Sequence, residues 1–410
     1  MMSTGGWRAS RRAMAGWLPV AALTALLGAA PPDQLTSELI FPGERGHVHA
    51  SSIVETPSGG LLVAWYENGD PSNTGPFEGQ DLDKRDDVRI SGARRAAGAT
   101  AWSTPYTLVD TATLPDNNPA LGIDRQGRLW LVHAVLLGVP EKAWGSALTH
   151  ALVSTDYDRD GTPRWDAAHV IAPRPPGMLS AVARVAEEAR VGPGRTTEVA
   201  ARANRLLEAM QDPYARRLGW MPRNHPLVLD DGTVLIPLAN ENFNMAAMAL
   251  AHDGGARWTY SSLVPTRGLI QPSVVRLRDG SLTAFFRDAR GTGRIGRSTS
   301  TDQGRTWTAA VSTELPNPSG GIEAVILRSG ALAVVFNDHT GSERDRLSIA
   351  VSSDEGSTWS ARRVIIHRPG ERFDYPSIIQ ARDGRIHVTF SDNLTSVRHV
   401  SFTEAWIAAE

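Results

Sequence analysis

The residues best suited to chemistry stand at the two ends of six apolar segments, not in one local motif. They are histidines, arginines, glutamates, asparagines and a tyrosine, which can bind anions or move protons. Those before the segments are His47, His49, Asn117, Asn118, Arg223, His225, Gln271, Glu323 and Tyr375. Those after the segments are Glu67, His133, Asn240, Glu241, Arg287, Asp288, Asn337, Asp338, Asp392 and Asn393. If the fold gathers them, they form a pocket suited to an acidic substrate, because a guanidinium grips a carboxylate with two hydrogen bonds.

Each of the six segments has the pattern of a β-hairpin: an apolar strand, a short polar turn that usually contains glycine, and another apolar strand. Two clear examples are "PSVVRLRDGSLTAFFRD" from Pro272 and "PSIIQARDGRIHVTFSD" from Pro376. The other four begin at Ser51, Pro119, Pro226 and Glu323. With 38 glycines, 26 prolines and 12 tryptophans, the composition also favours short strands and turns over long helices.

A second motif repeats beside the hairpins. "STDQGRTW" (300–307) returns as "SSDEGSTW" (352–359), about 50 residues later, which indicates repeated structural units. Weaker copies end at Trp102, Trp165 and Trp258. In this Asp box, Asp and Gly favour a tight turn, Ser and Thr can hydrogen-bond it, and Trp can pack between strands. We therefore interpret it as scaffold.

Four strands per repeat, in six repeats, predict an all-β chain folded as a six-bladed β-propeller, in which closure of the ring hides the sheet edges. We expect the propeller over residues 36–410, with the first and last units meeting. The inner strand of each blade and its return strand share one face, so the hairpin ends should converge on a central pocket. Apolar residues recur at helical spacing around "GPG" over about 177–219. This predicts a helical insertion between the second and third blades, either surface decoration or a lid over the pocket.

Asp boxes on a six-bladed propeller resemble the sialidase (neuraminidase) superfamily, in particular its bacterial branch with BNR or Asp-box repeats. The likeness covers essentially residues 40–406. Sialidases hold a sugar carboxylate with three arginines, attack the anomeric carbon with a tyrosine that a glutamate activates, and use an aspartate as acid/base. The resemblance implies that Arg287 and Arg346, with Arg344 as an alternative to Arg346, bind the carboxylate. It also implies that Tyr375, in "FDYPSII", is the nucleophile.

Three stretches depart from the sialidase pattern. "HVHASSI" stands where a sialidase has an Arg-Ile-Pro motif, so one arginine is missing and His49 or its neighbour takes its place. Gln271 stands where the activating glutamate is expected, and an amide cannot act as a base. In the expected acid/base loop, "ENGDPSNTGPFEGQDLDKRDD", Asp70, Glu78 and Asp81 are all candidates.

The residues and the resemblance together predict a sialidase-like glycoside hydrolase, an exo-glycosidase that acts on a sialic acid or uronate-type sugar of a glycan. The candidate catalytic residues are Tyr375, Glu78, Asp70, Glu323 and His49. The candidate substrate-binding residues are Arg287, Arg346, Gln271, Arg223, Asn118 and Asp338. Two alternatives remain open. One is a polysaccharide lyase, in which neutralising a uronate carboxylate eases removal of the neighbouring proton; the other is a propeller that binds glycans or proteins without catalysis.

A secretory signal peptide is expected over residues 1–30. Arg8, Arg11 and Arg12 precede an apolar run that ends in small residues at Ala30, and a basic start, an apolar middle and a small-residue exit are typical of such signals. We therefore expect the mature protein in the periplasm or secreted, without membrane attachment.

Charge and cysteine content exclude some partners. The formal net charge is −2, so no nucleic-acid partner is expected. The chain has no cysteine, which rules out disulfides and thiolate metal sites. No cofactor is expected, with calcium as an alternative because "DYDRDG" gives Asp156, Asp158 and Asp160 the spacing of a calcium loop. Ala167 stands where such a loop has its glutamate, so an Asp-box turn with an insertion is the preferred interpretation.

Overall fold

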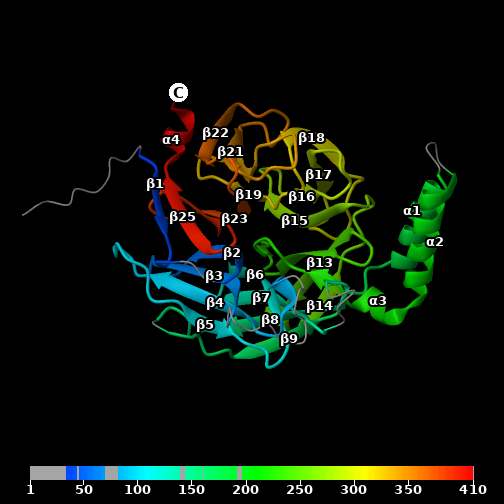
Figure 1. Cartoon of the computed structure of the whole chain (residues 1–410), viewed down its shortest axis with the longest axis horizontal. Coiled ribbons are helices and arrows are strands. Elements are labelled where there is room, and N and C mark those ends of the chain that lie inside the picture. Colours follow the sequence, from blue (N-terminus) through cyan, green and yellow to red (C-terminus); the bar gives the residue numbers. More distant parts are fainter. Residues whose placement is uncertain are drawn as a thin grey trace, which may run out of the picture. The chain divides into compact units, whose positions relative to one another are not determined.

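The described residues of the computed structural model are 34–43, 46–69, 82–138, 144–159, 161–191 and 196–409. They form six antiparallel sheets arranged in a ring (Figure 1). The predicted all-β fold and six-bladed propeller are confirmed, because each hairpin contributes the two inner strands of one sheet.

The strands follow the predicted repeat, with two further strands outside each hairpin. The first blade contains β2 (Val48–Glu55), β3 (Leu61–Asn68), β4 (Val88–Arg95) and β5 (Tyr106–Val109). The second contains β6 (Asp116–Ile123), β7 (Leu129–Leu136), β8 (Ala147–Ser154) and β9 (Ala167–Ile171). The third contains β10 (Trp220–Met221), β11 (Leu227–Val228), β12 (Val234–Asn240), β13 (Met245–His252) and β14 (Arg257–Tyr260).

The second half of the ring repeats this order. The fourth blade contains β15 (Leu269–Arg276), β16 (Leu282–Asp288), β17 (Arg294–Ser300) and β18 (Val311–Pro316). The fifth contains β19 (Glu323–Ile326), β20 (Leu332–Asn337), β21 (Arg346–Ser352) and β22 (Ala361–His367). The sixth contains β23 (Phe373–Gln380), β24 (Ile386–Asp392), β25 (Ser396–Phe402) and β1 (Thr36–Leu39).

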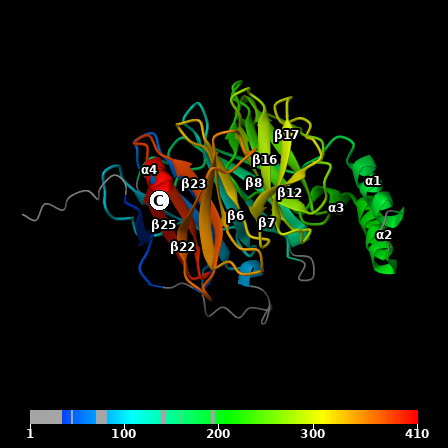
Figure 2. The same cartoon turned by 90° about the horizontal axis from the view of Figure 1, so that it is seen from above.

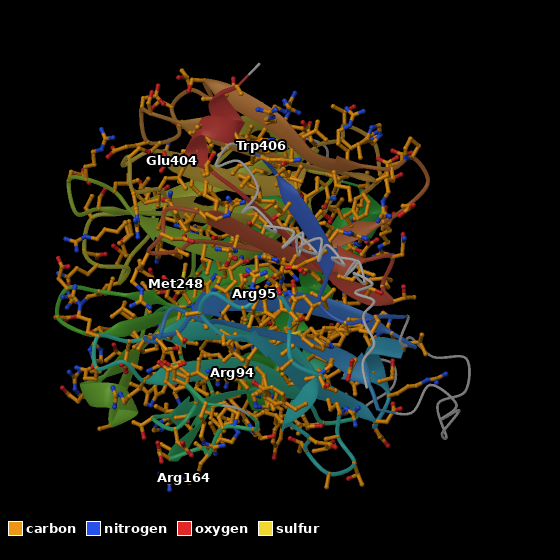
Figure 3. The ribbon with its side chains drawn as sticks, turned by 90° about the vertical axis from the view of Figure 1, so that its left-hand side faces the viewer. Arg94, Arg95, Arg164, Met248, Glu404 and Trp406 are labelled. Carbon is orange, nitrogen blue, oxygen red and sulfur yellow. The ribbon has the colours of Figure 1, made fainter. Side chains whose placement is uncertain are left out.

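The sixth blade therefore joins the two ends of the described chain. Its outermost strand, β1, pairs antiparallel with β25, with Thr36 opposite Ser401 and Leu39 opposite Arg398. The short helix α4 (Glu404–Ala408) follows β25, and its Trp406 ring packs on Phe402 with ring centroids 4.6 Å apart. Figure 3 shows Glu404 and Trp406 on this helix, and Arg94 and Arg95 on the first blade.

Side-chain hydrogen bonds link the inner strands of neighbouring blades. The hydroxyl of Ser52 accepts from Leu121 N at 3.0 Å, and that of Ser273 accepts from Ala324 N at 2.9 Å. Ser377 in the last blade accepts from Ile53 N in the first at 3.2 Å. The ring is thus joined at its axis as well as through β1.

The inner strands of four blades share a backbone distortion near the axis. Ala50, Asn118, Gln271 and Tyr375 all have left-handed backbone, with φ between 49° and 55°. At each of them the pairing with the next strand shifts register. Such a bulge removes one residue from the ladder and re-aims its side chain. The same bulge therefore occurs near the axis in four blades, each time with a different side chain.

The Asp boxes form self-contained turns. Ser300 Oγ donates to Asp302 at 2.8 Å and accepts from Gly304 N at 2.9 Å, while Thr306 Oγ1 donates to Asp302 at 2.6 Å. The corresponding contacts around Asp354 measure 2.7 Å in all three cases. These bonds fit the scaffold role expected for the motif.

The helical insertion lies between β9 and β10. It contains α1 (Met178–Val191), α2 (Thr197–Gln211) and α3 (Pro213–Arg217). Val182, Leu206 and Met210 are buried in one cluster with Trp220 and Phe243 of the third blade. The views in Figures 1 and 2 place α1 and α2 beside the third blade, on the side of the ring opposite α4. None of the helices in the described ranges has the length and apolar run needed to cross a membrane. The described ranges also contain the 3-10 turns η1 (Leu82–Lys84), η3 (Trp144–Ser146) and η4 (Asp253–Gly255).

Candidate functional site

Three predicted site residues meet at the axis. The Oη atom of Tyr375 accepts hydrogen bonds from Gln271 Nε2 at 3.0 Å and from Arg287 Nη1 at 3.1 Å. Arg287 Nη1 also donates to Gln271 Oε1 at 3.3 Å, which fixes the amide so that its NH₂ group faces the tyrosine. The bulges in β15 and β23 and the end of β16 therefore place a phenol, an amide and a guanidinium in one triangle.

The ring of Tyr375 is held on several sides. The guanidinium of Arg223 lies 4.7 Å from the ring centroid, and the His49 ring lies 4.3 Å away, centroid to centroid. A Cβ atom added to Gly321 would lie only 2.4 Å from Tyr375 Cδ1. The ring therefore has little room to turn, and Gly321 is a position where any side chain would displace it.

A second arginine joins this site at Ser319. Arg344 Nη2 donates to the carbonyl of Ser319 at 2.7 Å, while Arg287 Nε donates to its hydroxyl at 3.3 Å. Arg344 Nη1 also pairs with buried Asp374 at 2.6 Å, and Arg372 contacts the other oxygen of this carboxylate. Two guanidiniums thus share the carboxylate of Asp374, which leaves a positive charge beside Arg287.

The electrostatics favour an anionic ligand. Within the described residues, no carboxylate lies within 4.0 Å of the Arg287 guanidinium. Burial, the largest influence, would raise the pKa of Asp374, but neighbouring positive charges, including Arg344 and Arg372, lower it overall. Asp374 therefore stays ionised and neutralises only one of its two arginines.

The structure brings Arg344, not Arg346, to this convergence. Arg346 is the first residue of β21, where its main chain pairs with His367. Its Nε atom is buried without a hydrogen-bond partner. The expectation for Arg346 is therefore replaced by its alternative, because the strand begins two residues too late to bring Arg346 to Ser319.

Glu323 has a structural role in place of the expected catalytic one. It is 1% exposed, and its oxygens accept from His225 N at 2.8 Å, His225 Nδ1 at 2.9 Å and Ile378 N at 2.9 Å. The bond to Ile378 matches the inter-blade bonds that serines make elsewhere in the ring. In the fifth blade, Glu323 therefore makes the inter-blade hydrogen bond that a serine makes in three other blades. Burial would raise its pKa, but the charge and hydrogen bonds of His225 lower it.

Arg223 supports the tyrosine from inside the ring. It is fully buried, and its Nη1 and Nη2 atoms donate to the carbonyls of Ser51 at 3.3 Å and Pro376 at 3.0 Å. These contacts occupy both terminal nitrogens of the guanidinium that we expected to bind substrate, and its Nε is buried without a hydrogen-bond partner. Its place behind the ring makes Arg223 a positioning residue for Tyr375.

Of the remaining predicted residues, His49 lies against the Tyr375 ring, whereas Asn118 and Asp338 make their contacts elsewhere. His49 Nδ1 lies 3.0 Å from Ser391 Oγ, and burial lowers the pKa of His49 to about 4, so the ring is neutral at neutral pH. Asn118 is buried at the second-blade bulge. Asp338 pairs with Arg362 and is not among the contacts around Tyr375 in the described chain. Asp70 and Glu78 lie outside the described residues.

Two acidic groups near the site were not among the candidate catalytic or substrate-binding residues. Asp83 contacts His47 Nε2 and accepts from Tyr66 Oη at 2.7 Å. It belongs to the acidic loop in which we expected the acid/base residue. The sequence therefore identified the loop but not Asp83 itself. Burial raises the pKa of Glu241, and the charge of Arg287 acts in the opposite direction. Glu241 stands at a hairpin end, where its polarity alone did not distinguish it.

The calcium alternative stays a prediction. Asp156 pairs with Arg159 at 2.7 Å, and Asp158 accepts from Ser58 N at 2.8 Å and from Arg94 at 3.1 Å. Asp160 lies outside the described residues. In the described part of the chain, no group of three or more His, Cys, Asp or Glu residues is placed to hold a metal ion.

Comparisons with known proteins agree with this fold. The BNR repeat-like domain family matches residues 215–388. A sialidase of Bacteroides fragilis is 25% identical over 187 residues, which make up 43% of this chain and 34% of that protein. The chain thus spans about a third of the length of this curated relative.

Solved sialidase structures share the fold at low sequence identity. A Hadza microbial sialidase superposes with a TM-score of 0.65 at 17% identity, over 89% of this chain and 67% of that one. The NanB sialidase of Streptococcus pneumoniae gives 0.64 at 13% identity, over 93% and 72%. A leech intramolecular trans-sialidase gives 0.64 at 12% identity, over 91% and 71%.

The chain therefore has the fold of the solved sialidase propellers, and residues 215–388 within it are similar to the BNR repeat-like domain family.

Proposed function

We propose that the protein is an exo-glycosidase that removes a terminal carboxylate-bearing sugar, of sialic acid or uronate type, from a glycan. The observation that carries this proposal is the 3.1 Å hydrogen bond between Arg287 and the phenol of Tyr375. It places a guanidinium, which has no carboxylate partner among the described residues, beside a potential nucleophile.

Arg287 and Arg344 are the proposed carboxylate-binding pair. Both are tied to Ser319 by hydrogen bonds, so their guanidiniums are held in place before the ligand arrives. A planar guanidinium matches a carboxylate and stays charged at any working pH. A sugar carboxylate held between them would bring the neighbouring anomeric carbon toward Tyr375.

In the proposed reaction, Tyr375 Oη forms a bond to the anomeric carbon while the bond to the leaving oxygen breaks. An acid protonates the leaving oxygen, and water then releases the sugar from the tyrosine. The phenol must lose its proton, and Gln271 cannot take it. Neutral His49, whose ring packs against Tyr375, is the proposed acceptor. Its pKa of about 4 makes it a weak base, so we expect slow turnover.

The amide of Gln271 also favours a second candidate, a propeller that binds the acidic sugar without cleaving it. Its NH₂ group points at Tyr375, and its oxygen accepts from Arg287, so the triangle holds no base. Gln271→Glu separates the two candidates. It would place a carboxylate about where the amide now lies, 3.0 Å from Oη. We expect faster release of sugar if the protein is a slow hydrolase, and no release by either form if it only binds.

The primary test is incubation with glycans that end in sialic acid or in a uronate, with released sugar measured by chromatography. Released sugar that is lost in Tyr375→Phe, while binding is kept, supports the hydrolase. Ultraviolet absorbance of an unsaturated uronate would show a lyase. Binding without product would leave the non-catalytic candidate, and neither binding nor product would contradict both.

We also propose that the protein is exported to the periplasm or beyond. Residues 1–30, which carry the signal pattern, lie outside the described residues. N-terminal sequencing of protein from the periplasm or medium should begin near Pro31. An intact Met1 in that material, or protein found only in the cytoplasm, would contradict export.

A further inference from the structure

A cavity of about 1070 Å³ lies between the helical insertion and the third and fourth blades. Four arginines line it: Arg202 and Arg205 from α2, Arg267 before β15, and Arg290 after β16. Two acidic residues, Asp212 and Glu241, also line it. The cavity therefore has more positive than negative side chains in its walls, from elements far apart in the sequence.

Protein contacts neutralise only half of these arginines. Arg290 pairs with Asp288 at 2.9 Å, and Arg202 lies 3.8 Å from Glu198. In the described ranges, no carboxylate lies within 4.0 Å of Arg205 or Arg267, whose Nε donates to the carbonyl of Phe243. These two guanidiniums are the ones available to a ligand.

The acidic groups in the wall, Asp212 and Glu241, are fewer than the four arginines. Asp212 is the N-cap of α3 and accepts from Tyr214 N at 2.8 Å. Burial raises the pKa of Glu241, which favours its neutral form. Burial and then the charge of Arg202 lower the pKa of Arg267, so like charges face each other here. Such an arrangement costs stability unless an anion binds between the charges.

The helices that carry Arg202 and Arg205 are firmly attached to the propeller. Asn242 Nδ2 donates to the carbonyls of Gly145 at 2.9 Å and Ala215 at 3.2 Å, which ties the third blade to the second and to α3. Trp220 Nε1 donates to the carbonyl of Arg216 at 3.0 Å. With the apolar packing of α2 on the third blade, these contacts hold the arginines over the cavity without a ligand.

The cavity lies next to the site around Tyr375. Its wall includes Ala289, which follows Arg287 by two residues, and Glu241, on which the charge of Arg287 acts. A glycan whose terminal sugar contacts Arg287 would therefore extend toward the arginines of the insertion.

We propose that this cavity is an anion-binding subsite for a carboxylate or sulfate group on the glycan chain beyond the terminal sugar. The assignment to a glycan rests on the proposed function, whereas anion binding by Arg205 and Arg267 does not. The preferred substrate is then a polyanionic glycan, which carries at least one further negative charge behind its terminal acidic sugar.

Calorimetric titration of the full-length protein tests the subsite with three hexasaccharides: hyaluronate for carboxylates, chondroitin sulfate for added sulfates, and neutral maltohexaose. The test variant is Arg205→Ala/Arg267→Ala. The matched control is Arg184→Ala/Arg190→Ala, which removes the same charge from α1 of the same insertion, outside the cavity wall. We expect the test variant to weaken binding of the anionic probes about 10- to 100-fold and the control to change it little. Thermal melting checks that both variants fold.

The outcomes separate this subsite from the central site. If only the test variant loses binding to both anionic probes, the subsite accepts either a carboxylate or a sulfate. If it loses binding to only one probe, the subsite prefers the anionic group of that probe. Equal affinity in the wild type and the test variant, or an equal loss in the control, would overturn the subsite. Free sialic acid and glucuronate serve as monosaccharide probes for Arg287. If they fail to bind while the hexasaccharides do, the proposed function fails and the subsite stands.

Discussion

The Asp-box turns and the inner-strand bulges both repeat around the ring, but they repeat different properties. Around Asp302 and Asp354 the same residue types make the same three hydrogen bonds, at distances that differ by no more than 0.2 Å. At the bulges the backbone is the same, with φ from 49° to 55°, but the side chains are those of Ala50, Asn118, Gln271 and Tyr375.

This difference shows where the repeat is constrained by folding and where it is not. An Asp box must keep its side chains because they form the turn. A bulge is formed by the backbone, so its side chain can change without loss of the turn, and two of them, Gln271 and Tyr375, contact each other across the axis. Substitutions in the two regions should therefore affect different measurements.

The largest effect is expected for Arg287→Ala. Loss of its contacts to the ligand should weaken binding or turnover of an acidic sugar by about 2–4 kcal/mol, the scale for removing one partner of a desolvated charge pair. The melting temperature should change little, since the residue stands at a strand end. Arg125→Ala, in an exposed hairpin turn, is the control. Unchanged binding of acidic sugars by folded Arg287→Ala would place the carboxylate site elsewhere.

Gly321→Ala tests whether the Tyr375 ring must keep its position. The added methyl would lie 2.4 Å from Cδ1 of the ring, so the ring must move. Because misplacement of a reacting group by about 1 Å can cost about 100-fold, we expect a 10- to 100-fold lower kcat. Gly341→Ala, where the methyl meets exposed side chains, is the control. An unchanged kcat in Gly321→Ala would argue against Tyr375 as nucleophile.

Asp302→Ala should show the opposite pattern, with stability affected and chemistry spared. The carboxylate accepts from Ser300, from the main chain of Arg305 and from Thr306, and its loss should lower the free energy of unfolding by about 1–3 kcal/mol. Denaturant titration measures this, and sugar binding well below the melting temperature should match the wild type. Asp354→Ala should act in the same direction. A binding defect with normal stability would mean that the Asp box is more than scaffold.

The smallest effect concerns pH and the sixth blade. His387 Nδ1 and His399 Nε2 lie 2.9 Å apart, and burial first, then the charges of His399, Arg95 and Arg385, lower the pKa of His387 to about 2. Below about pH 6.5, the pKa of a histidine in the unfolded chain, the unfolded chain binds a proton that the folded chain does not bind. The free energy of unfolding therefore falls as the pH falls.

For this one histidine, we expect a loss of about 1 kcal/mol at pH 5.5 relative to pH 8. Denaturant titrations of the wild type and His387→Asn at both pH values measure it. The variant should show the smaller loss, because its side chain does not titrate. Identical slopes in the two proteins would contradict the expected pKa of His387.

Much of the architecture was predictable because its signals are local. Alternating apolar residues mark the hairpins, and the Asp-box residues make contacts within a few positions of one another. The helices of the insertion were likewise visible from apolar spacing, although Leu179 is exposed and Ala186 and Ala203 supply part of the buried face.

The site was predictable only in part because its details depend on where strands begin. Glu323 stands at the start of its apolar segment, like Gln271 and Tyr375, but it occupies the position of Ser273 and Ser377, two residues further along the strand. Gly321 stands two residues before Glu323, without the left-handed backbone of Gln271 and Tyr375. The choice between Arg344 and Arg346 depends in the same way on the first residue of β21. A shift of two residues in where a strand begins changes a candidate catalytic residue into one that bonds neighbouring blades. No local pattern in the sequence indicates this shift.

The pairing of β1 with β25 has a consequence for how the chain folds. Thr36 and Ser401, whose hydroxyls lie 3.1 Å apart, are separated by 365 positions in the sequence. The first five blades can form in order as the chain emerges from the ribosome, but the sixth needs both ends. Closure is therefore the last step of folding, and a slow one, because contacts of high sequence separation carry the largest loop-closure entropy. Until then the ring is an open arc with unpaired strand edges at both ends, which is the state most exposed to aggregation.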